Sequence, residues 1–207
     1  SGDKTIEIQA AMFPVRYQDF DQGIVEKVVE PFLENNSIDM LATISMGREH
    51  FDLEHFPGRR RSSSAPDNNN IYSGGSAAKP IIGKIGEKHL EGPEFVEFSL
   101  PYEAMVKTKG KYQISDNREV TTLKKTFKPN SLEELKDAIA VEGGGGGYLS
   151  NEISYRTVLL GNKLGTTVPT GHIHTPRIKE FDKDVIKAIV EQIKGMLIHG
   201  VNEGEVH

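Results

Sequence analysis

The 207-residue chain contains no cysteine and no tryptophan. Without cysteine, neither a disulfide nor a thiolate metal site can form. The lack of disulfides suits a reducing compartment, so we expect a cytoplasmic location. No apolar run is long enough to span a bilayer, and no membrane partner is expected. The chain opens on Ser1-Gly2-Asp3, where Ser-Gly has the composition of a cloning scar, which leaves open whether native residues precede it.

The chain also has fewer positive than negative side chains. The formal net charge is −5, from 25 Lys and Arg against 30 Asp and Glu. The one basic run, Arg59 to Arg61, is short and is followed by three serines. These features argue against a nucleic-acid partner. The length and the 36% hydrophobic content suit one domain with one sizeable core.

Strand and helix patterns alternate along most of the chain. The elements expected from periodicity and length are a strand at 5–16, a helix at 22–35 loosened by Pro31, a strand at 38–45 buried on both faces, a helix at 152–161, a strand at 167–174 and a helix at 182–199 ended by Gly200. This alternation predicts an α/β fold, a single-domain α/β/α sandwich with a mostly parallel central sheet, over residues 1–207.

The middle of the chain breaks the alternation. Residues 59–78 are rich in Ser, Asn, Gly and Pro and are expected to form a loop. Short strands are expected at 81–82, 95–100 and 112–114. Ser131 and Glu134 have capping-box spacing and predict a helix to about residue 140. We interpret residues 72–130 as an insertion that adds a small antiparallel subregion.

Five consecutive glycines, Gly143 to Gly147, lead through Tyr148 and Leu149 to Ser150 at the start of a predicted helix. A glycine turn allows close backbone approach, and first-turn N–H groups favour negative charge on a nucleophile or an oxyanion. His174 follows 24 residues later at a strand end and is a candidate general base. The bland alternatives are a helix N-cap for Ser150 and a flexible loop for the glycines.

Three segments resemble the signature of pyroglutamyl peptidase I, a family of cysteine peptidases. They are GGYLSN with Ser150, GHIHTP with His174, and Gly47-Arg48 followed after six residues by Glu54 and after twelve more by Pro66-Asp67-Asn68. The resemblance places Ser150 at the position of the nucleophilic cysteine and Ser64 at that of an arginine. The family's N-terminal segment with its aromatic clamp has no counterpart in the chain.

The resemblance implies a hydrolase that removes an N-terminal pyroglutamyl or related blocked residue from peptides. Ser150 would be the nucleophile, His174 the general base and Glu54 the residue that orients the imidazole. The resemblance also implies a peptide N-terminus as partner, a homo-oligomer, and neither a cofactor nor a metal.

Three other interpretations stay open. The chain could be a catalytically inactive family member that binds peptide termini or proteins. It could be a serine hydrolase for another amide or ester, with Phe95, Tyr102 and Tyr112 shaping its pocket. His172 and His174 also lie on one face of a strand, where they could bind zinc with a third ligand from among His50, Glu54 and His55.

Overall fold

The computed structural model describes residues 6–204. Its helices are α1 Tyr17–Asp21, α2 Ile24–Glu34, α3 Tyr102–Met105, the 3₁₀ helix η1 Leu132–Leu135, α4 Leu149–Leu164 and α5 Lys183–Gly204. Its strands are β1 Leu41–Met46, β2 Phe51–Glu54, β3 Arg60–Arg61, β4 Ile81–Ile82, β5 Lys84–Ile85, β6 Lys88–His89, β7 Ile114–Asn117, β8 Val120–Thr122, β9 Thr126–Phe127, β10 Ala140–Glu142 and β11 Thr170–Thr175.

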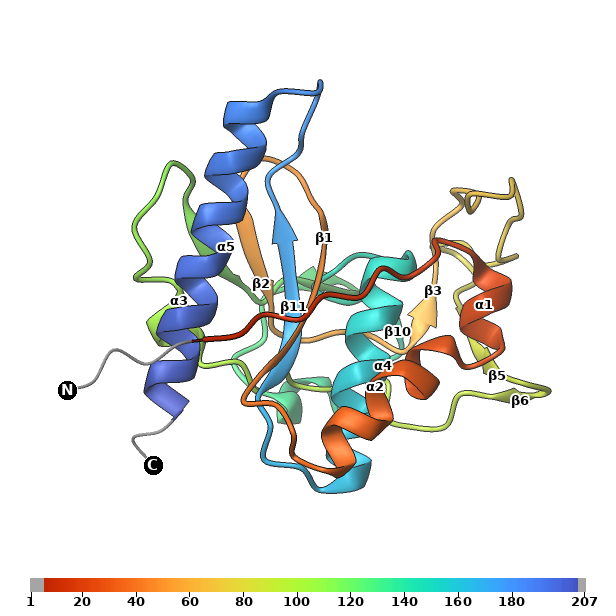
Figure 1. Ribbon diagram of the computed structural model, residues 1–207. Helices are drawn as coiled ribbons and strands as arrows, with labels where there is room; N and C mark the ends of the chain where they lie inside the picture. The colour runs from red at the N-terminus through yellow and green to blue at the C-terminus, as the bar shows by residue number, and fades with distance from the viewer. Residues whose placement is uncertain (1–5, 205–207) are drawn as a thin grey trace.

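The central sheet has four strands in the order β1-β11-β2-β7. β1 pairs in parallel with β11 and β2 in parallel with β7, whereas β11 and β2 are antiparallel. Helices α5 and α3 lie on one side of the sheet, and α4 and α2 lie on the other (Figure 1). The predicted α/β/α architecture with a mostly parallel sheet is confirmed. Within residues 6–204, no helix is both long and apolar enough to cross a membrane.

Two apolar cores hold the layers together. The larger lies between the sheet and α5 and extends to α4, with Phe51, Leu53 and Ile173 from the strands and Met196 from α5 all fully buried. The second joins α2 to α4 through the buried stripe Val25, Val29 and Leu33. α2 begins after Gly23, whose φ of 76° is a left-handed conformation that glycine adopts without strain. Each such buried side chain stabilises the fold by ~1.5–3 kcal/mol.

The strand expected at 5–16 is wrong for its described part, because residues 6–16 form no regular structure. Residue 5 lies outside the described residues. The alternating side chains have no core to face: Ile8 is 50% exposed and Met12 is 99% exposed. Figure 1 shows this segment crossing in front of the sheet on its way to α1.

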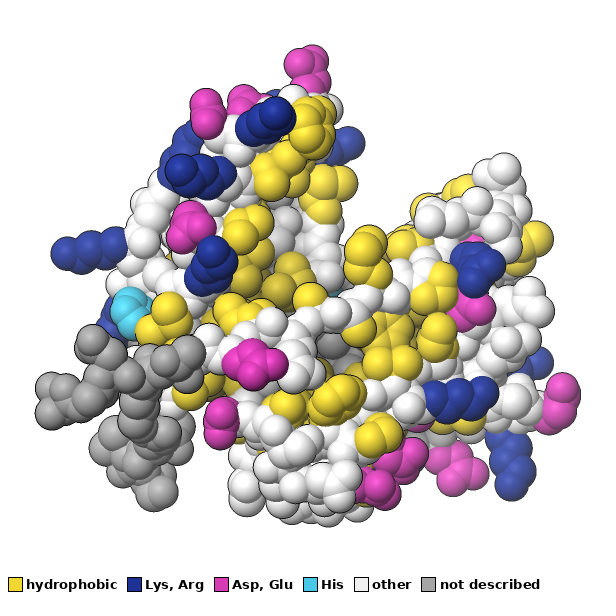
Figure 2. All heavy atoms as spheres, in the orientation of Figure 1, with side chains coloured by type: hydrophobic (Ala, Val, Ile, Leu, Met, Phe, Trp, Pro, Cys, Tyr) yellow, Lys and Arg dark blue, Asp and Glu magenta, His cyan; other side chains and the backbone are white. Residues whose placement is uncertain are grey.

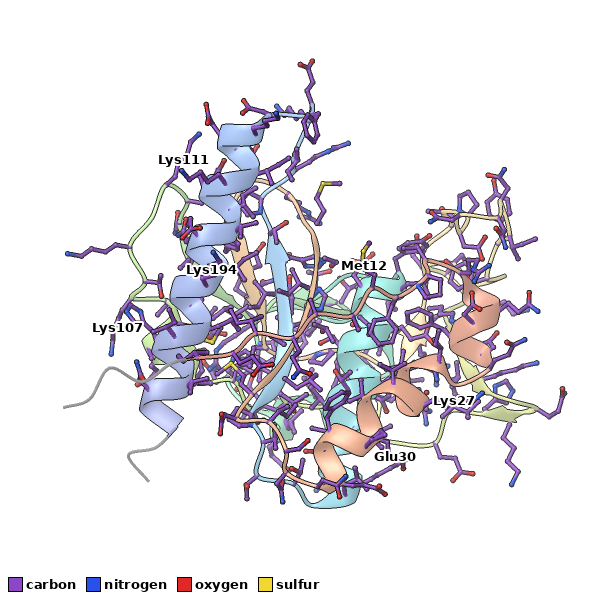
Figure 3. The ribbon with its side chains drawn as sticks, viewed as in Figure 1. Met12, Lys27, Glu30, Lys107, Lys111 and Lys194 are labelled. Atoms are coloured by element: carbon purple, nitrogen blue, oxygen red, sulfur yellow. The ribbon has the colours of Figure 1, made fainter. Side chains whose placement is uncertain are left out.

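The neighbouring strand β1 is confirmed, but it is not buried on both faces. It is one of the two edge strands of the sheet, and its Ile44 and Met46 side chains are 45% and 56% exposed. Figure 2 shows hydrophobic side chains lining a notch between the part of the molecule built on α5 and the part that carries α1 and β3. Met12 lies in the middle of this view, and Lys194 of α5 is labelled to its left with Lys107 and Lys111 from the segment after α3 (Figure 3).

Several local expectations in the middle of the chain are wrong. Residues 95–100 form no strand, although Phe98 N–H donates to His55 O at 3.0 Å beside β2. The capping box does not form: Glu134 accepts from Asn130 instead of Ser131, and only the four-residue η1 follows. The loop at 59–78 is confirmed except for the two residues of β3. The interpretation of 72–130 as an insertion stays a prediction, although this range supplies β7 to the central sheet.

The last helix also differs from expectation, since α5 continues past Gly200 to Gly204. Gly200 is buried where the helix meets the loop before β1, and a Cβ there would lie 2.5 Å from Met40 Cε. This glycine therefore serves close packing within the helix and does not end it.

Candidate active site

Glu54 and His174 meet on the α4 face of the sheet. Side chains alternate between the faces of a strand, so Asp52 and Glu54 of β2 share one face with His172 and His174 of β11. His174 Nδ1 and Glu54 Oε1 are 2.5 Å apart. Glu54 is 1% exposed. An ionised carboxylate only accepts hydrogen bonds, so Nδ1 donates and Nε2 is left free to take a proton.

The charge on Glu54 is set by opposing effects. Burial raises the pKa of the Glu54 carboxyl, and the hydrogen bond and charge of His174 and the hydrogen bond of Asn117 act in the other direction. A buried carboxylate that is held by specific donors and aimed at a histidine is a frequent feature of catalytic sites.

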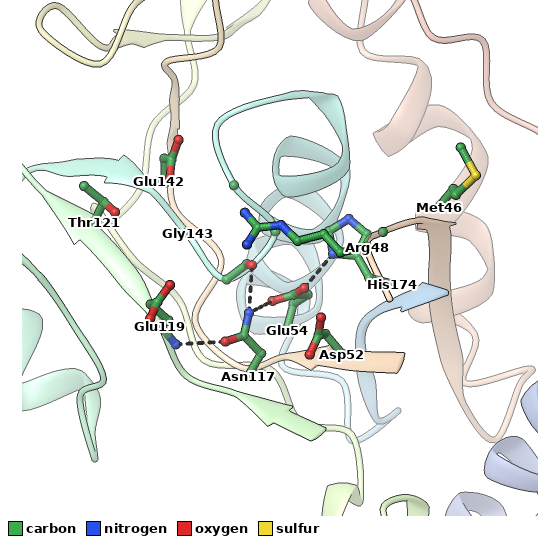
Figure 4. Close-up of a pocket in the computed structure, with 14 residues that line it drawn as sticks. Met46, Arg48, Asp52, Glu54, Asn117, Glu119, Thr121, Glu142, Gly143 and His174 are labelled. Atoms are coloured by element: carbon green, nitrogen blue, oxygen red, sulfur yellow. Dashed lines mark hydrogen bonds and ion pairs between the residues drawn. The ribbon is translucent and has the colours of Figure 1, made fainter. Parts of the chain in front are cut away.

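Asn117 was not anticipated from the sequence. It ends β7, where the parallel register places it directly opposite Glu54. Its Nδ2 donates to Glu54 Oε2 at 2.7 Å and to Gly144 O at 3.2 Å (Figure 4). The signal in the sequence was a polar residue at the end of a strand, but it pointed to Glu54 only once β7 was known to pair with β2.

The five glycines form a tight turn packed on this site. Gly143 and Gly146 exchange backbone hydrogen bonds of 3.0 and 2.9 Å, and Gly146 has a φ of 83°. A Cβ at Gly144 would lie 2.7 Å from Glu54 Oε2, and one at Gly147 would lie 1.9 Å from Ser62 Oγ. The run is therefore glycine because the backbone touches its neighbours, and it is not a free flexible loop.

Asn151 fixes the turn from the side of α4. Its side chain exchanges two hydrogen bonds with the backbone of Gly58, at 2.9 and 2.8 Å. A Cβ at Gly143 would lie 2.2 Å from Asn151 Oδ1. The start of α4, the turn and the segment after β2 are thus locked together.

Ser150 lies in the first turn of α4 but is not its N-cap, which is Tyr148. Its half-buried hydroxyl donates to Gly145 O at 3.2 Å. Among residues 6–204, no hydrogen bond joins Ser150 to His174. The structure thus brings Glu54 and His174 into contact and places the Ser150 hydroxyl against the glycine turn, where it bonds to Gly145 O.

His172 is a core residue. It is fully buried, with Nδ1 2.7 Å from Thr43 Oγ1 and Nε2 2.8 Å from Ser45 Oγ. Burial, with a smaller effect of the His174 charge, lowers the pKa of His172 well below its ordinary value, so this imidazole is neutral. Its ring lies edge-on to that of His174, with centroids 4.7 Å apart.

The ligand set that the zinc interpretation needs is not assembled in the described part of the chain, where no three His, Asp or Glu side chains gather as metal ligands. His50 pairs with Asp52 at 3.0 Å. His55 lies against Phe56 and Phe98 and pairs with Asp116 at 2.7 Å.

A cavity of about 270 Å³ opens beside Glu54 and His174. The glycine turn forms one part of its wall, and the carboxylates Asp52, Glu119 and Glu142 form others. Arg48 reaches across it above Glu54 (Figure 4). Ser150 is not among the described residues that line it.

The aromatic pocket of the alternative serine hydrolase is not formed by the three residues named for it. Phe95 is buried in a third core cluster. Tyr102 stacks on Phe98 with ring centroids 5.9 Å apart. Tyr112 meets Phe51 edge-on at 6.1 Å.

The arginine run is structural. Arg59 and Arg60 both pair with Glu94, each at 2.7 Å. Arg61 pairs with Glu152 at 2.5 Å and with Asp21 at 2.6 Å. Ser64, at the family's arginine position, is exposed.

Comparison with known proteins identifies the family. Residues 1–94 and 112–179 match the family described as "PA0049, C-terminal domain". These ranges hold more than half of the 207 residues, so the chain belongs to this family. The uncharacterized protein PA0049 of Pseudomonas aeruginosa is 45% identical over 42 residues. The match spans 20% of this chain and only 8% of that protein's length.

Solved structures show the same fold in peptidases. Pyrrolidone carboxyl peptidase from Pyrococcus furiosus aligns with a TM-score of 0.58 and 18% identity, covering 92% of this chain and 80% of the other. A mutant of the same enzyme aligns with a TM-score of 0.57 and 19% identity, covering 92% and 79%. At this level of identity the likeness establishes a shared fold, and activity has to be argued from the site.

Proposed function

We propose that this chain is a hydrolase that cleaves an N-terminal pyroglutamyl or related blocked residue from peptides. The observation that carries the proposal is the buried Glu54–His174 pair, 2.5 Å apart, beside a glycine turn and a helix start. These are the parts that acyl transfer requires: a base, a residue that orients it, and backbone N–H groups near the nucleophile.

The first half of the reaction forms an acyl-enzyme. In this step the Ser150 hydroxyl, which donates to Gly145 O in the structure, exchanges that partner for His174. Its oxygen bonds to the substrate carbonyl carbon while its proton passes to His174 Nε2. Glu54 stabilises the resulting imidazolium through Nδ1–H. N–H groups of the first turn of α4, which have no partner within the helix, face the oxyanion.

The second half releases the products. His174 gives its proton to the leaving nitrogen as the C–N bond breaks, and the peptide departs as an amine. A water molecule then attacks the acyl carbon and gives its proton to His174. The C–O bond to Ser150 breaks, and the serine oxygen takes that proton back. Each proton that His174 takes, first from Ser150 and then from water, is passed on, first to the leaving amine and then back to Ser150.

The test is turnover of a substrate panel. It contains the aminomethylcoumarin amides of pyroglutamate, acetyl-alanine and alanine, and p-nitrophenyl acetate as an ester. We expect the pyroglutamyl amide to be cleaved fastest. Ser150→Ala and His174→Ala should abolish this turnover, whereas the exposed controls Ser37→Ala and His89→Ala should retain it. Equal turnover in all five proteins would refute the assigned site.

A second candidate function is binding without cleavage. It is favoured by one observation: the Ser150 hydroxyl bonds to Gly145 O and not to His174. In that case the panel shows no turnover, while calorimetry detects binding of a pyroglutamyl peptide that weakens in His174→Ala. We also retain as a proposal, from the family resemblance, that the chain forms a homo-oligomer.

A further inference from the structure

We infer that Asn117 is a positioning residue, which holds Glu54 toward His174 and ties this pair to the glycine turn. The inference rests on the proposed function, because it assigns Asn117 a part in the same site. Three hydrogen bonds of one side-chain amide carry it.

The polarity of the amide is fixed by its partners. Asn117 Oδ1 accepts from Glu119 N–H at 3.2 Å. This directs Nδ2 toward two acceptors, Glu54 Oε2 at 2.7 Å and Gly144 O at 3.2 Å. An asparagine in the opposite orientation would set its oxygen against a carboxylate and a carbonyl. Asn117 is therefore the donor, and Glu54 is the acceptor that its ionised form requires.

Glu54 needs this donor because it has little access to water. Its side chain is 2% exposed, and its two oxygens are divided between His174 and Asn117. Without Asn117, Oε2 would be buried with no side-chain donor, and a buried acceptor without a partner costs ~1–3 kcal/mol. The carboxyl would then protonate more readily or rotate away from the imidazole. Either change removes the support of the imidazolium.

The bond to Gly144 O adds a connection that the pair alone lacks. Gly144 N–H donates to Phe56 O at 3.0 Å, so the turn is held through both backbone groups of Gly144. Asn117 therefore fixes the distance between the general base and the backbone groups around the nucleophile. A change of about 1 Å in such distances can cost roughly a hundredfold in rate.

Two substitutions separate these contributions. Asn117→Ala removes all three bonds. Asn117→Asp keeps the shape but replaces the donor with an acceptor that faces Glu54 Oε2. Asn162→Ala is the matched control, since Asn162 is exposed on α4 and makes no side-chain hydrogen bond within the described residues. Circular dichroism establishes that each variant is folded.

The primary readout does not depend on turnover. It is the pH titration of the Glu54 carboxyl carbon by ¹³C NMR, assigned by its loss in Glu54→Gln. We expect the midpoint to move to higher pH in Asn117→Ala and further in Asn117→Asp, and to stay at the parent value in Asn162→Ala. An unchanged midpoint in both folded Asn117 variants would overturn the inference. This holds whether or not the protein turns over any substrate.

The second readout uses the substrate that the panel identifies. We expect Asn117→Ala to lower kcat by roughly 10- to 100-fold with KM nearly constant, as when outer-shell partners of metal-binding histidines are removed. The acid limb of the pH profile should move to higher pH with the NMR midpoint. A loss confined to KM would contradict a positioning role. Absence of turnover in the parent defeats the proposed function, and the NMR result still decides the inference.

Discussion

At the residue scale, Glu54 shows how a charge is kept inside an apolar fold. The side chain comes from the last residue of a buried strand, so its backbone position cannot move toward solvent. Burial alone would keep the carboxyl protonated. Hydrogen bonds from His174 and Asn117 favour the ionised form, in which the residue can stabilise an imidazolium.

This environment determines how the contribution of Glu54 to stability changes with pH. Burial raises the pKa of Glu54 above the ordinary value of 4.5. A raised carboxyl pKa means that the folded protein holds this proton more tightly than the unfolded chain. The contribution of Glu54 to stability is therefore present at low pH and is lost as pH rises through its folded pKa.

Activity follows the opposite course, because only ionised Glu54 supports His174. We expect kcat to fall on acidification through a pH clearly above 4.5, measured as a pH–rate profile. Glu54→Gln should lower kcat by up to roughly 10⁴-fold, as the Asp→Asn exchange does in serine peptidase triads. A profile that stays flat down to pH 4.5 would show that Glu54 does not take part.

Part of this site could be predicted from the sequence. Glu54 and His174 were predicted because each lies in a short segment whose internal spacing resembles that of the family. Asn117 was missed, since its role depends on the pairing of β7 with β2, and the boundaries of β7 could not be drawn from Tyr112 to Ile114 alone. The pairing of Ser150 with Gly145 O depends on the shape of the turn, which five identical residues do not specify.

At the element scale, α4 is the helix that carries the proposed nucleophile. Its second residue is Ser150, and two residues later Glu152 is buried between Arg61 and Arg156. Both guanidinium groups also bond elsewhere, Arg61 to Asp21 at 2.6 Å and Arg156 to Glu26 at 3.0 Å. This network joins α4 to α1, α2 and β3, and so fixes the helix start against the sheet.

Replacing Glu152 by glutamine should destabilise the protein strongly. The substitution leaves two buried cations without their shared carboxylate, and breaking a buried ion pair costs ~3–5 kcal/mol. The measurement is chemical denaturation at neutral pH. The control is Glu191→Gln on α5, whose side chain is 59% exposed and pairs with Lys194, so a change of ~0–1 kcal/mol is expected.

The stability difference between the parent and Glu152→Gln should change with pH in one direction. Burial disfavours the charged form of Glu152, but the hydrogen bonds and charges of Arg61 and Arg156 hold its pKa below the ordinary value. Its stabilising contribution is present above the unfolded pKa and is lost as pH falls through the folded one. The stability gap between the parent and Glu152→Gln should therefore narrow on acidification. A gap that widens would contradict this account of α4.

The elements that the sequence predicted well are those whose burial follows a simple period. α2 and α5 each bury one stripe, and β11 is a short run enclosed by the sheet. α4 was also predicted, although it is buried on almost every side from Ser154 to Gly161. Residues 6–16 have a strand pattern, but no neighbouring strand bonds to them. The capping box at Ser131 does not form, because the Glu134 side chain accepts a hydrogen bond from Asn130 instead. Tertiary context decided the first case, and a competing local hydrogen bond between residues four apart decided the second.

At the scale of the whole molecule, the comparisons establish the fold, whereas the chemistry has to be argued from the residues of the site. The chain belongs to the PA0049 C-terminal domain family and shares the fold of pyrrolidone carboxyl peptidase. That fold brings β2, β7 and β11 together at one site beside the start of α4. In the proposed mechanism, reactivity depends on one atom, the oxygen of Ser150, because this atom is the nucleophile that Glu54 and His174 would activate.

The most direct test is the exchange of that atom. Ser150→Cys should cleave the pyroglutamyl amide faster than the parent, because a thiol ionises far more readily than an alkanol. Adding His174→Ala to this variant should abolish the gain. We predict measurable turnover by the cysteine variant that depends on His174. A folded cysteine variant with no turnover, or with turnover indifferent to His174, would contradict the claim that Glu54, His174 and residue 150 form one hydrolytic site.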